Sequence, residues 1–343
     1  MFFLWEHLKS TKKPIVLYGM GNGGDIILNQ MEKLNISCSG VFASDDFVRG
    51  QDFRGFKVTN YKTLKDKYGD MIVLSAFGSS RESVINNMIK IGRECEFYSP
   101  DVPVYGENIF DRNFYNENLE KIEKVKNMLS DELSKEIFSS IINFKAGGKL
   151  SDLFAAETDK SENFKLLNPG NSENYLDLGA FTGDTVLEFI KSVKKYKSIT
   201  AVEPDIKNYN RLLKNTNGTY YFKAVNCGIW SHDTELNFLF EGGRNNSVVK
   251  KGKIVQVKSI DSILKGSPVS LVKMDIEGSE KEAILGAKHT ILKFKPKMKI
   301  ACYHRTEDIF EIPLEVMKIR NDYKLFIRHS RYIPAWDTDF YFI

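Results

Sequence analysis

Three short segments place acids and glycines at the points where apolar runs end. They are DLGAFTGDT at residues 177–185, EPD at residues 203–205 and KMDIEGSE at residues 273–280. Each segment follows a short apolar run typical of a buried strand, and each leads into a helical pattern. Ligands of parallel α/β sheets bind at the carboxyl ends of the strands. The spacing therefore predicts one ligand site that these segments share.

The first segment is a strand end, a glycine turn and a helix start. Gly179 and Gly183 would let the backbone approach a ligand closely, and the helix that follows presents free amide groups. The turn departs from the dinucleotide pattern GxGxxG, because it has two glycines and Asp177 two residues before the first. A carboxylate repels a pyrophosphate and attracts a sulfonium cation, so the charge favours S-adenosylmethionine (SAM) over NAD. Tight packing alone also explains many such glycines.

The second segment supplies a carboxylate for a ribose. Glu203 lies 26 positions beyond Asp177 (203 − 177), at the predicted end of the next strand. A carboxylate there can accept two hydrogen bonds from a ribose diol, and hydrogen bonds to a charged group contribute about 1.5–3 kcal/mol. Pro204 then stops the strand.

The order of these segments resembles the FkbM-type family of SAM-dependent methyltransferases. The similar motifs are DLGAFTGDT, AVEPD, VNCGIW, VKMDIEGSE and ACYHRTED, and the resemblance covers about residues 150–343. It implies that the methionine part of SAM is held by Asp177, Gly179, Gly183, Asp184 and Thr185, the ribose by Glu203, and the adenine by Asn226 and Cys227. It also implies O-methylation of a sugar, nucleotide sugar or glycan precursor.

A hydroxyl acceptor has to lose a proton, which indicates a base near the strand ends. His304 follows the strand next to Asp275, and histidine titrates close to neutral pH. The hypothesis is that His304 is the base and that Asp275 orients it or the acceptor. A structural histidine fits the pattern equally well. In the alternative, Asp275 and Glu277 bind Mg²⁺, which holds the acceptor oxygen.

The acceptor pocket has further candidate residues. Phe181, Trp230 and the loop at residues 242–247 lie close to the motifs in the sequence. Aromatic packing and an ordinary turn explain these residues as well.

A second glycine turn near the start predicts a competing function. GMGNGG at residues 19–24 fits GxGxxG through Gly19, Gly21 and Gly24, and Asp45 lies 21 residues further on (45 − 24). The alternative function is therefore a nucleotide- or NAD-binding protein in which the second domain is a binding or scaffold module. Glycines retained for packing, in a scaffold or oligomerisation unit, are the simpler reading.

The alternation of strands and helices predicts an α/β protein of two doubly wound, Rossmann-like domains. The first covers residues 1–112 and the second, a class I methyltransferase fold closed by an antiparallel hairpin, covers residues 150–343. Residues 113–149 form a helical connector that is expected to pack at the surface.

Composition excludes some partners. Lys and Arg number 49 against 45 Asp and Glu, a net charge of +4 that predicts no nucleic-acid partner. The four cysteines form no metal-binding pair, so no structural metal is expected and the thiols are typical of a cytoplasmic protein. No apolar run is long enough for membrane insertion. The expected partner is a small sugar or glycan acceptor, with a homo-oligomer as an open possibility.

Overall fold

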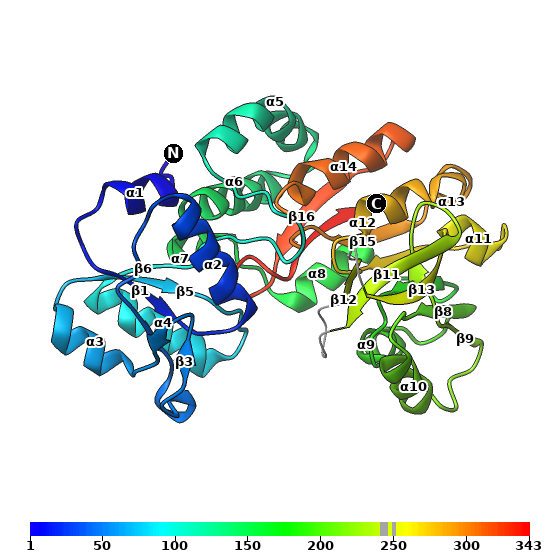
Figure 1. Cartoon of the computed structure of the whole chain (residues 1–343). Helices are drawn as coiled ribbons and strands as arrows, with labels where there is room; N and C mark the ends of the chain where they lie inside the picture. The colour runs from blue at the N-terminus through cyan, green and yellow to red at the C-terminus, as the bar shows by residue number, and fades with distance from the viewer. Residues whose placement is uncertain (241–245, 249–251) are drawn as a thin grey trace.

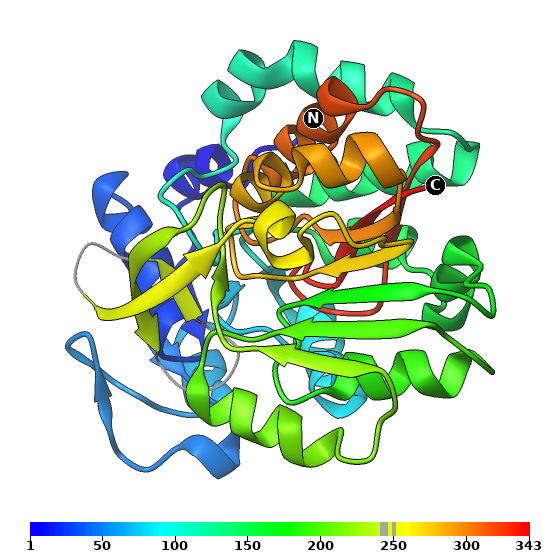
Figure 2. The same ribbon diagram turned by 90° about the vertical axis from the view of Figure 1, so that its right-hand side faces the viewer.

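The computed structural model describes residues 1–240, 246–248 and 252–343, and its two main sheets, one parallel and one mixed, are joined by helices (Figures 1 and 2). No helix in these ranges combines the length and apolarity that a membrane crossing requires. The predicted α/β fold class is confirmed by both sheets.

The first sheet has four parallel strands in the order β2-β1-β5-β6. Its strands are β1 (Ile15–Tyr18), β2 (Gly40–Phe42), β5 (Ile72–Ser75) and β6 (Glu96–Tyr98). Its helices are α1 (Leu4–Ser10), α2 (Asn22–Lys33), α3 (Tyr61–Tyr68) and α4 (Glu82–Glu94), with a short 3₁₀ turn (Asp45–Phe47) and a hairpin of β3 (Asp52–Phe53) and β4 (Phe56–Lys57). Every residue of β1 and β5 is buried, as expected of central parallel strands.

The second sheet has seven strands in the order β16-β17-β15-β14-β7-β8-β9. The strands are β7 (Asn174–Leu178), β8 (Ser198–Val202), β9 (Phe222–Val225), β14 (Leu271–Met274), β15 (Lys297–Ala301), β16 (Leu325–His329) and β17 (Thr338–Phe342). Strand β17 is antiparallel to both of its neighbours, so the predicted closing hairpin is confirmed. The helices are α9 (Asp184–Ser192), α10 (Ile206–Asn215), α11 (Ile260–Leu264), α12 (Glu280–Leu285), α13 (Lys288–Phe294) and α14 (Asp308–Ile319).

Two local features differ from the sequence prediction. The apolar spacing of residues 280–292 predicts one helix, and this prediction is wrong: the chain breaks between α12 and α13, where a Cβ on Gly286 would lie 2.3 Å from the Trp230 carbonyl oxygen. A small third sheet was also missed, with the order β10-β13-β11-β12. Its strands are β10 (Gly228–Ile229), β11 (Thr234–Phe240), β12 (Asn246–Val248) and β13 (Lys253–Lys258).

The connector is a structural core and not a surface link. Its helices are α5 (Arg112–Met128) and α6 (Glu132–Gly147), followed by α7 (Leu150–Ala156) and α8 (Lys160–Leu167). Figure 1 shows α5 and α6 at the top, between the four-stranded sheet at the left and the seven-stranded sheet at the right. Most of the second half of α6 is buried, and one hydrophobic cluster contains Val73 of the first sheet, Phe138 of α6 and Phe340 of the second. The expected surface packing is therefore wrong, because α6 has an apolar surface that both sheets help to cover.

Polar contacts fix α6 against the second sheet. The buried Arg328 guanidinium of β16 donates to the Ser134 hydroxyl at 2.7 Å and to Asp131 at 2.8 Å. Asp131 also caps α6 by accepting from the Ser134 amide. Hydrogen bonds thus hold the start of α6 against β16, in addition to the contacts of the apolar face of α6.

The shared core predicts how the protein unfolds. Phe138→Ala should lower the free energy of unfolding by about 3–5 kcal/mol, because Phe138 is 1% exposed and its removal leaves a cavity between the sheets. Leu133→Ala on the same helix, where the side chain is 47% exposed, should change it by less than about 0.5 kcal/mol. Calorimetry should show one shifted transition for Phe138→Ala. Selective melting of one sheet would contradict the shared core.

Candidate functional site

A cavity of about 220 Å³ opens at the carboxyl ends of β7, β8 and β14. The predicted site residues that line it are Gly179, Asp184, Thr185, Glu203, Cys227, Asp275 and Glu277. Phe181 lines it too, whereas Trp230 lines a different groove. Residues 242–245 of the predicted pocket loop lie outside the described residues. The structure thus gathers all three sequence segments around one space.

Four predicted residues stand beside the cavity and support its walls. Asp177 is fully buried, accepts from the Thr185 hydroxyl and lies 3.4 Å from the Lys273 ammonium. The Asn226 amide nitrogen donates to the Glu203 carbonyl oxygen at 2.8 Å, so it holds the end of β8. The other two are Gly183 and His304.

The glycines of the turn are needed for the protein's own packing. A Cβ on Gly179 would lie 1.9 Å from the Asp275 carbonyl oxygen, and a Cβ on Gly183 would lie 3.0 Å from the Leu212 side chain. Both glycines have positive φ, and so does Phe181 between them, at 48°. The turn therefore brings the ends of β7 and β14 into contact, with one non-glycine residue in a conformation that costs free energy.

Glu203 is held at the end of β8 with its carboxylate toward the cavity. The side chain is 3% exposed and accepts from the Phe181 amide at 3.0 Å and from the Asp205 amide at 2.9 Å. Burial raises the pKa of Glu203 to about 7, although both amide hydrogen bonds lower it. The Asn208 side chain also hydrogen-bonds to this carboxylate and lowers its pKa.

Lys273 is a site residue to which the sequence analysis gave no role. Its ammonium donates to the Gly179 carbonyl oxygen at 2.8 Å and lies 4.0 Å from Asp275. Burial lowers the pKa of Lys273, but the charges of Asp177 and Asp275 raise it by more. The net pKa is therefore above the usual lysine value, and the side chain stays protonated. The sequence could have indicated this role, because Lys273 lies inside the VKMDIEGSE motif and pairs with Asp177 between the neighbouring strands β14 and β7.

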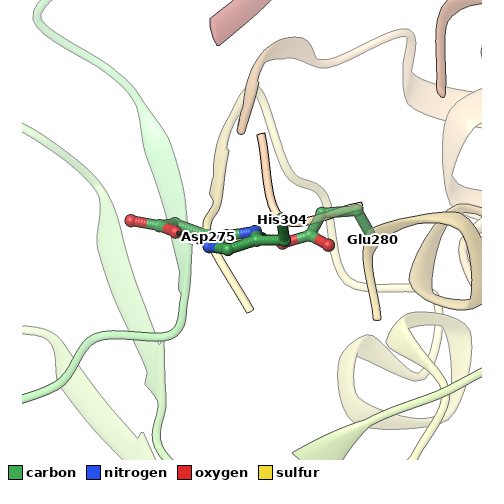
Figure 3. Close-up of side chains that lie close together, drawn as sticks. All are labelled: Asp275, Glu280 and His304. Carbon is green, nitrogen blue, oxygen red and sulfur yellow. Dashed lines mark ion pairs between the residues drawn. The ribbon is translucent and has the colours of Figure 1, made fainter. Parts of the chain in front are cut away.

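Behind the acids Asp275 and Glu277 of the cavity lies a histidine that carboxylates surround. His304 is 1% exposed, and its Nδ1 lies 2.9 Å from Glu280, which is fully buried. On the opposite ring nitrogen, Nε2 lies 3.3 Å from Asp275 and 3.4 Å from Glu277. Figure 3 shows the imidazole between Asp275 and Glu280. All three acids come from the segment after β14, with Glu280 at the start of α12, whereas His304 follows β15.

This arrangement makes His304 a cation. Burial lowers the pKa of His304, but the charges of Glu280, Glu277 and Asp275 raise it more, and the result is about 10. Burial also raises the pKa of Glu277 to about 7, against the charge of His304. For Asp275, burial raises the pKa, but Lys273 and His304 lower it below its usual value. At neutral pH, His304 therefore has no lone pair with which to accept a proton.

A metal ion is a second way to neutralise these acids. Ligand atoms of Asp275, Glu280 and His304 lie within 4.8 Å of one another. However, Asp275 and Glu280 face opposite nitrogens of one ring, so the imidazolium already lies between them. The geometry favours the internal cation as their partner.

The glycine turn of the first sheet is closely packed as well. A Cβ on Gly19 would lie 2.5 Å from the Phe77 ring, and one on Gly24 would lie 3.0 Å from the Phe53 ring, whereas Gly21 faces open space. Asp45 begins the 3₁₀ turn beyond the end of β2 and is exposed. Packing therefore accounts for two of the three motif glycines, and nucleotide binding here stays a prediction.

Comparison with known proteins identifies the class of this site. Residues 177–326 match the family model of the methyltransferase FkbM domain, so this part of the chain is an FkbM methyltransferase domain, as the motifs predicted. A crystal structure of methyltransferase FkbM from Methylobacillus flagellatus KT is similar over 99% of this chain and 92% of that chain, with a TM-score of 0.76 and 20% identity. This chain therefore shares the fold of that structure, first sheet and connector included.

Other similarities are more distant. Aeropyrum pernix fibrillarin in complex with S-adenosyl-L-methionine covers 54% of this chain and 74% of its own, with 12% identity and a TM-score of 0.35. An rRNA methylase from Streptococcus thermophilus covers 53% and 92%, with 10% identity and a TM-score of 0.35. No curated protein matches the sequence.

The charge of His304 can be measured directly. In an NMR titration of the imidazole signals, His304 should remain protonated at pH 8 and lose its proton near pH 10, because three carboxylates face the buried ring. Since this pKa is raised on folding, the stabilisation is complete below about pH 6.5 and is lost as the pH rises toward 10. The signals of exposed His232 serve as the internal reference in the same spectra. Deprotonation of His304 below pH 7 would contradict the assignment.

Proposed function

We propose that the protein is a SAM-dependent O-methyltransferase that acts on a hydroxyl of a sugar, nucleotide sugar or glycan precursor. The observation that supports this best is one cavity with a ribose-type carboxylate, Glu203, at one end and the acids Asp275 and Glu277 at the other. The first end fits a nucleoside, and the second fits a group that must release a proton.

The residues present fit SAM. Glu203 lines the cavity as an acceptor for ribose hydroxyls, and its amide contacts hold it in place. Beside it, the buried side chains of Cys227, Ile229 and Phe238 give an apolar wall for a flat ring. Asp184 and Thr185 line the next part of the cavity, where a cationic amino-acid group would find a carboxylate. When bound, SAM supplies an activated methyl group.

Cofactor binding should depend on the ionised form of Glu203. Glu203→Gln should weaken SAM binding about ten- to hundredfold, because the ribose would lose charge-assisted hydrogen bonds. In the unchanged protein, the affinity should fall roughly tenfold for each pH unit below 7, since Glu203 with a pKa of about 7 becomes protonated there. Isothermal titration calorimetry measures both effects.

Exposed Glu123 on α5 is the matched control for Glu203, and Glu123→Gln should leave the dissociation constant unchanged. If the unchanged protein binds no SAM at any pH, the proposed cofactor is wrong. Equal affinity in Glu203→Gln would exclude only the ribose contact.

Within the acid end, Glu277 is placed to take the acceptor proton. It lines the cavity, its side chain is 20% exposed, and its pKa of about 7 suits a base at neutral pH. The original candidate, His304, is buried behind it and positively charged, so it would stabilise the ionised carboxylates and hold them in position. Asp275, ionised at neutral pH, would accept a hydrogen bond from the acceptor. Methyl transfer then needs mainly the alignment of donor and acceptor.

A polyhydroxylated acceptor suits the rest of the lining. The cavity continues past Lys273 to Lys299, Ser330 and Asp337. The Lys299 ammonium lies 3.1 Å from Asp339, and an ammonium has three donors. Alternating ammonium and carboxylate groups can both donate to and accept from neighbouring hydroxyls, which is the chemistry that a sugar ring presents.

Methyl transfer from labelled SAM to a panel of free sugars, nucleotide sugars and surface glycans tests the function. We expect label on a hydroxyl of at least one class. With that acceptor, Glu277→Gln should lower kcat about 10²- to 10⁴-fold at an unchanged SAM affinity, because only the proton transfer is lost. Glu123→Gln should retain full activity.

Two results would change this proposal. Transfer to nitrogen in place of oxygen, or no transfer although SAM binds, would contradict the acceptor class. Loss of activity in EDTA that Mg²⁺ restores would favour the alternative in which Asp275 and Glu277 bind the ion, whereas activity that is unaffected by EDTA favours Glu277 as the base.

A further inference from the structure

The linker segment, residues 99–111, connects β6 of the first sheet to α5 and passes beside the acid end of the cavity. It is anchored at both ends. The Ser99 amide donates to the Gly148 carbonyl oxygen at 2.8 Å, and Asp101 pairs at 2.8 Å with Lys145, whose side chain is 4% exposed. Further along, Phe110 is fully buried. The middle of this segment is therefore held in a defined place.

The middle of the linker segment contacts the turn that carries His304. The Tyr105 amide donates to the His304 carbonyl oxygen at 2.9 Å. The buried Thr306 hydroxyl donates to the Asn108 carbonyl oxygen, and the Asn108 side chain donates to Glu307 at 3.2 Å. Three of the four positions 304–307 are thus hydrogen-bonded to a segment that comes from the other sheet.

The Tyr105 side chain contacts both site turns at once. The Arg305 guanidinium carbon lies 4.1 Å from the centre of the Tyr105 ring, and the Arg305 Nε donates to the Gly278 carbonyl oxygen at 2.7 Å. A Cβ on Gly278 would lie 2.9 Å from the Tyr105 Cβ, so only glycine allows this approach. Gly278 directly follows Glu277, and Arg305 directly follows His304.

We propose that Tyr105 is a positioning residue of the methyltransferase: its ring, stacked on Arg305 and packed on Gly278, fixes the relative positions of Glu277 and His304. The role of Glu277 in this inference rests on the proposed function, but the contacts of Tyr105 with the two turns do not. The linker segment thereby makes the first sheet and the connector part of the working site.

The physical reason is that both turns need support from the side opposite the strands. Glu277 has a φ of +57°, a conformation that persists only where the surroundings hold it. Four acids face the imidazole: Asp275, Glu277, Glu280 and Asp308. Two further cations lower the pKa of these acids, since the Arg305 charge acts on Asp308 and the Lys273 charge acts on Glu277. Loss of the ring frees Arg305 and Gly278 together, so the acids move away from His304 and water enters. The imidazolium then loses part of its stabilisation.

An NMR titration of His304 in the full-length protein tests the proposal without SAM or an acceptor. In Tyr105→Ala the pKa of His304 should fall by about one unit or more, which is a tenfold change in its protonation equilibrium. Tyr105→Phe keeps the ring and should titrate like the unchanged protein, because the stack and the Gly278 contact use no hydroxyl. Arg305→Lys keeps the charge but loses the planar group, and it should shift His304 in the same direction as Tyr105→Ala.

Calorimetric unfolding shows whether each variant is folded, and it needs neither SAM nor an acceptor. The proposal is overturned if Tyr105→Ala and Arg305→Lys leave the titration of His304 unchanged, or if Tyr105→Phe shifts it as far as Tyr105→Ala does. Because these readouts need no methyl transfer, a failure here is distinct from a failure of the proposed activity.

Discussion

The balance of buried charge at the carboxyl end of the seven-stranded sheet is the constraint on which the site depends. Asp177 and Glu280 are both fully buried, and Asp275 lies between the cations Lys273 and His304. Isolated buried carboxylates would be costly, and each of these three has a cation within about 4 Å. The two cations come from β14 and from the end of β15, which are neighbours in the sheet.

This balance explains how two similar acids acquire different properties. Asp275 lies near both cations and keeps a low pKa, whereas Glu277 is dominated by burial and its pKa rises to about 7. One carboxylate is thus suited to hydrogen bonding and the other to accepting a proton, within the same turn. His304, which has the side chain most often used as a base, is instead the fixed charge that creates this difference.

The connector places the site within a larger unit. Helix α6 shares a hydrophobic cluster with both sheets, and the linker segment bonds to the turns after β14 and β15. The similarity to methyltransferase FkbM from Methylobacillus flagellatus KT extends over 99% of the chain, so the two structures share the overall fold. The first sheet therefore contributes to the methyltransferase through packing, whatever its own glycine turn binds.

Local sequence patterns determined the elements and the general place of the site. Apolar runs ending in acids and glycines identified β7, β8 and β14, and parallel strands bring such ends to one edge, so Glu203, Asp275 and Glu277 could be predicted together. Only the tertiary structure decided what each group does. The charge of His304 comes from residues up to 29 positions away (304 − 275), and Gly179 faces Asp275 across two strands. The role of Tyr105 depends on a segment that starts in the other sheet. Burial and the distances between charges set these properties, and neither follows from spacing along the chain.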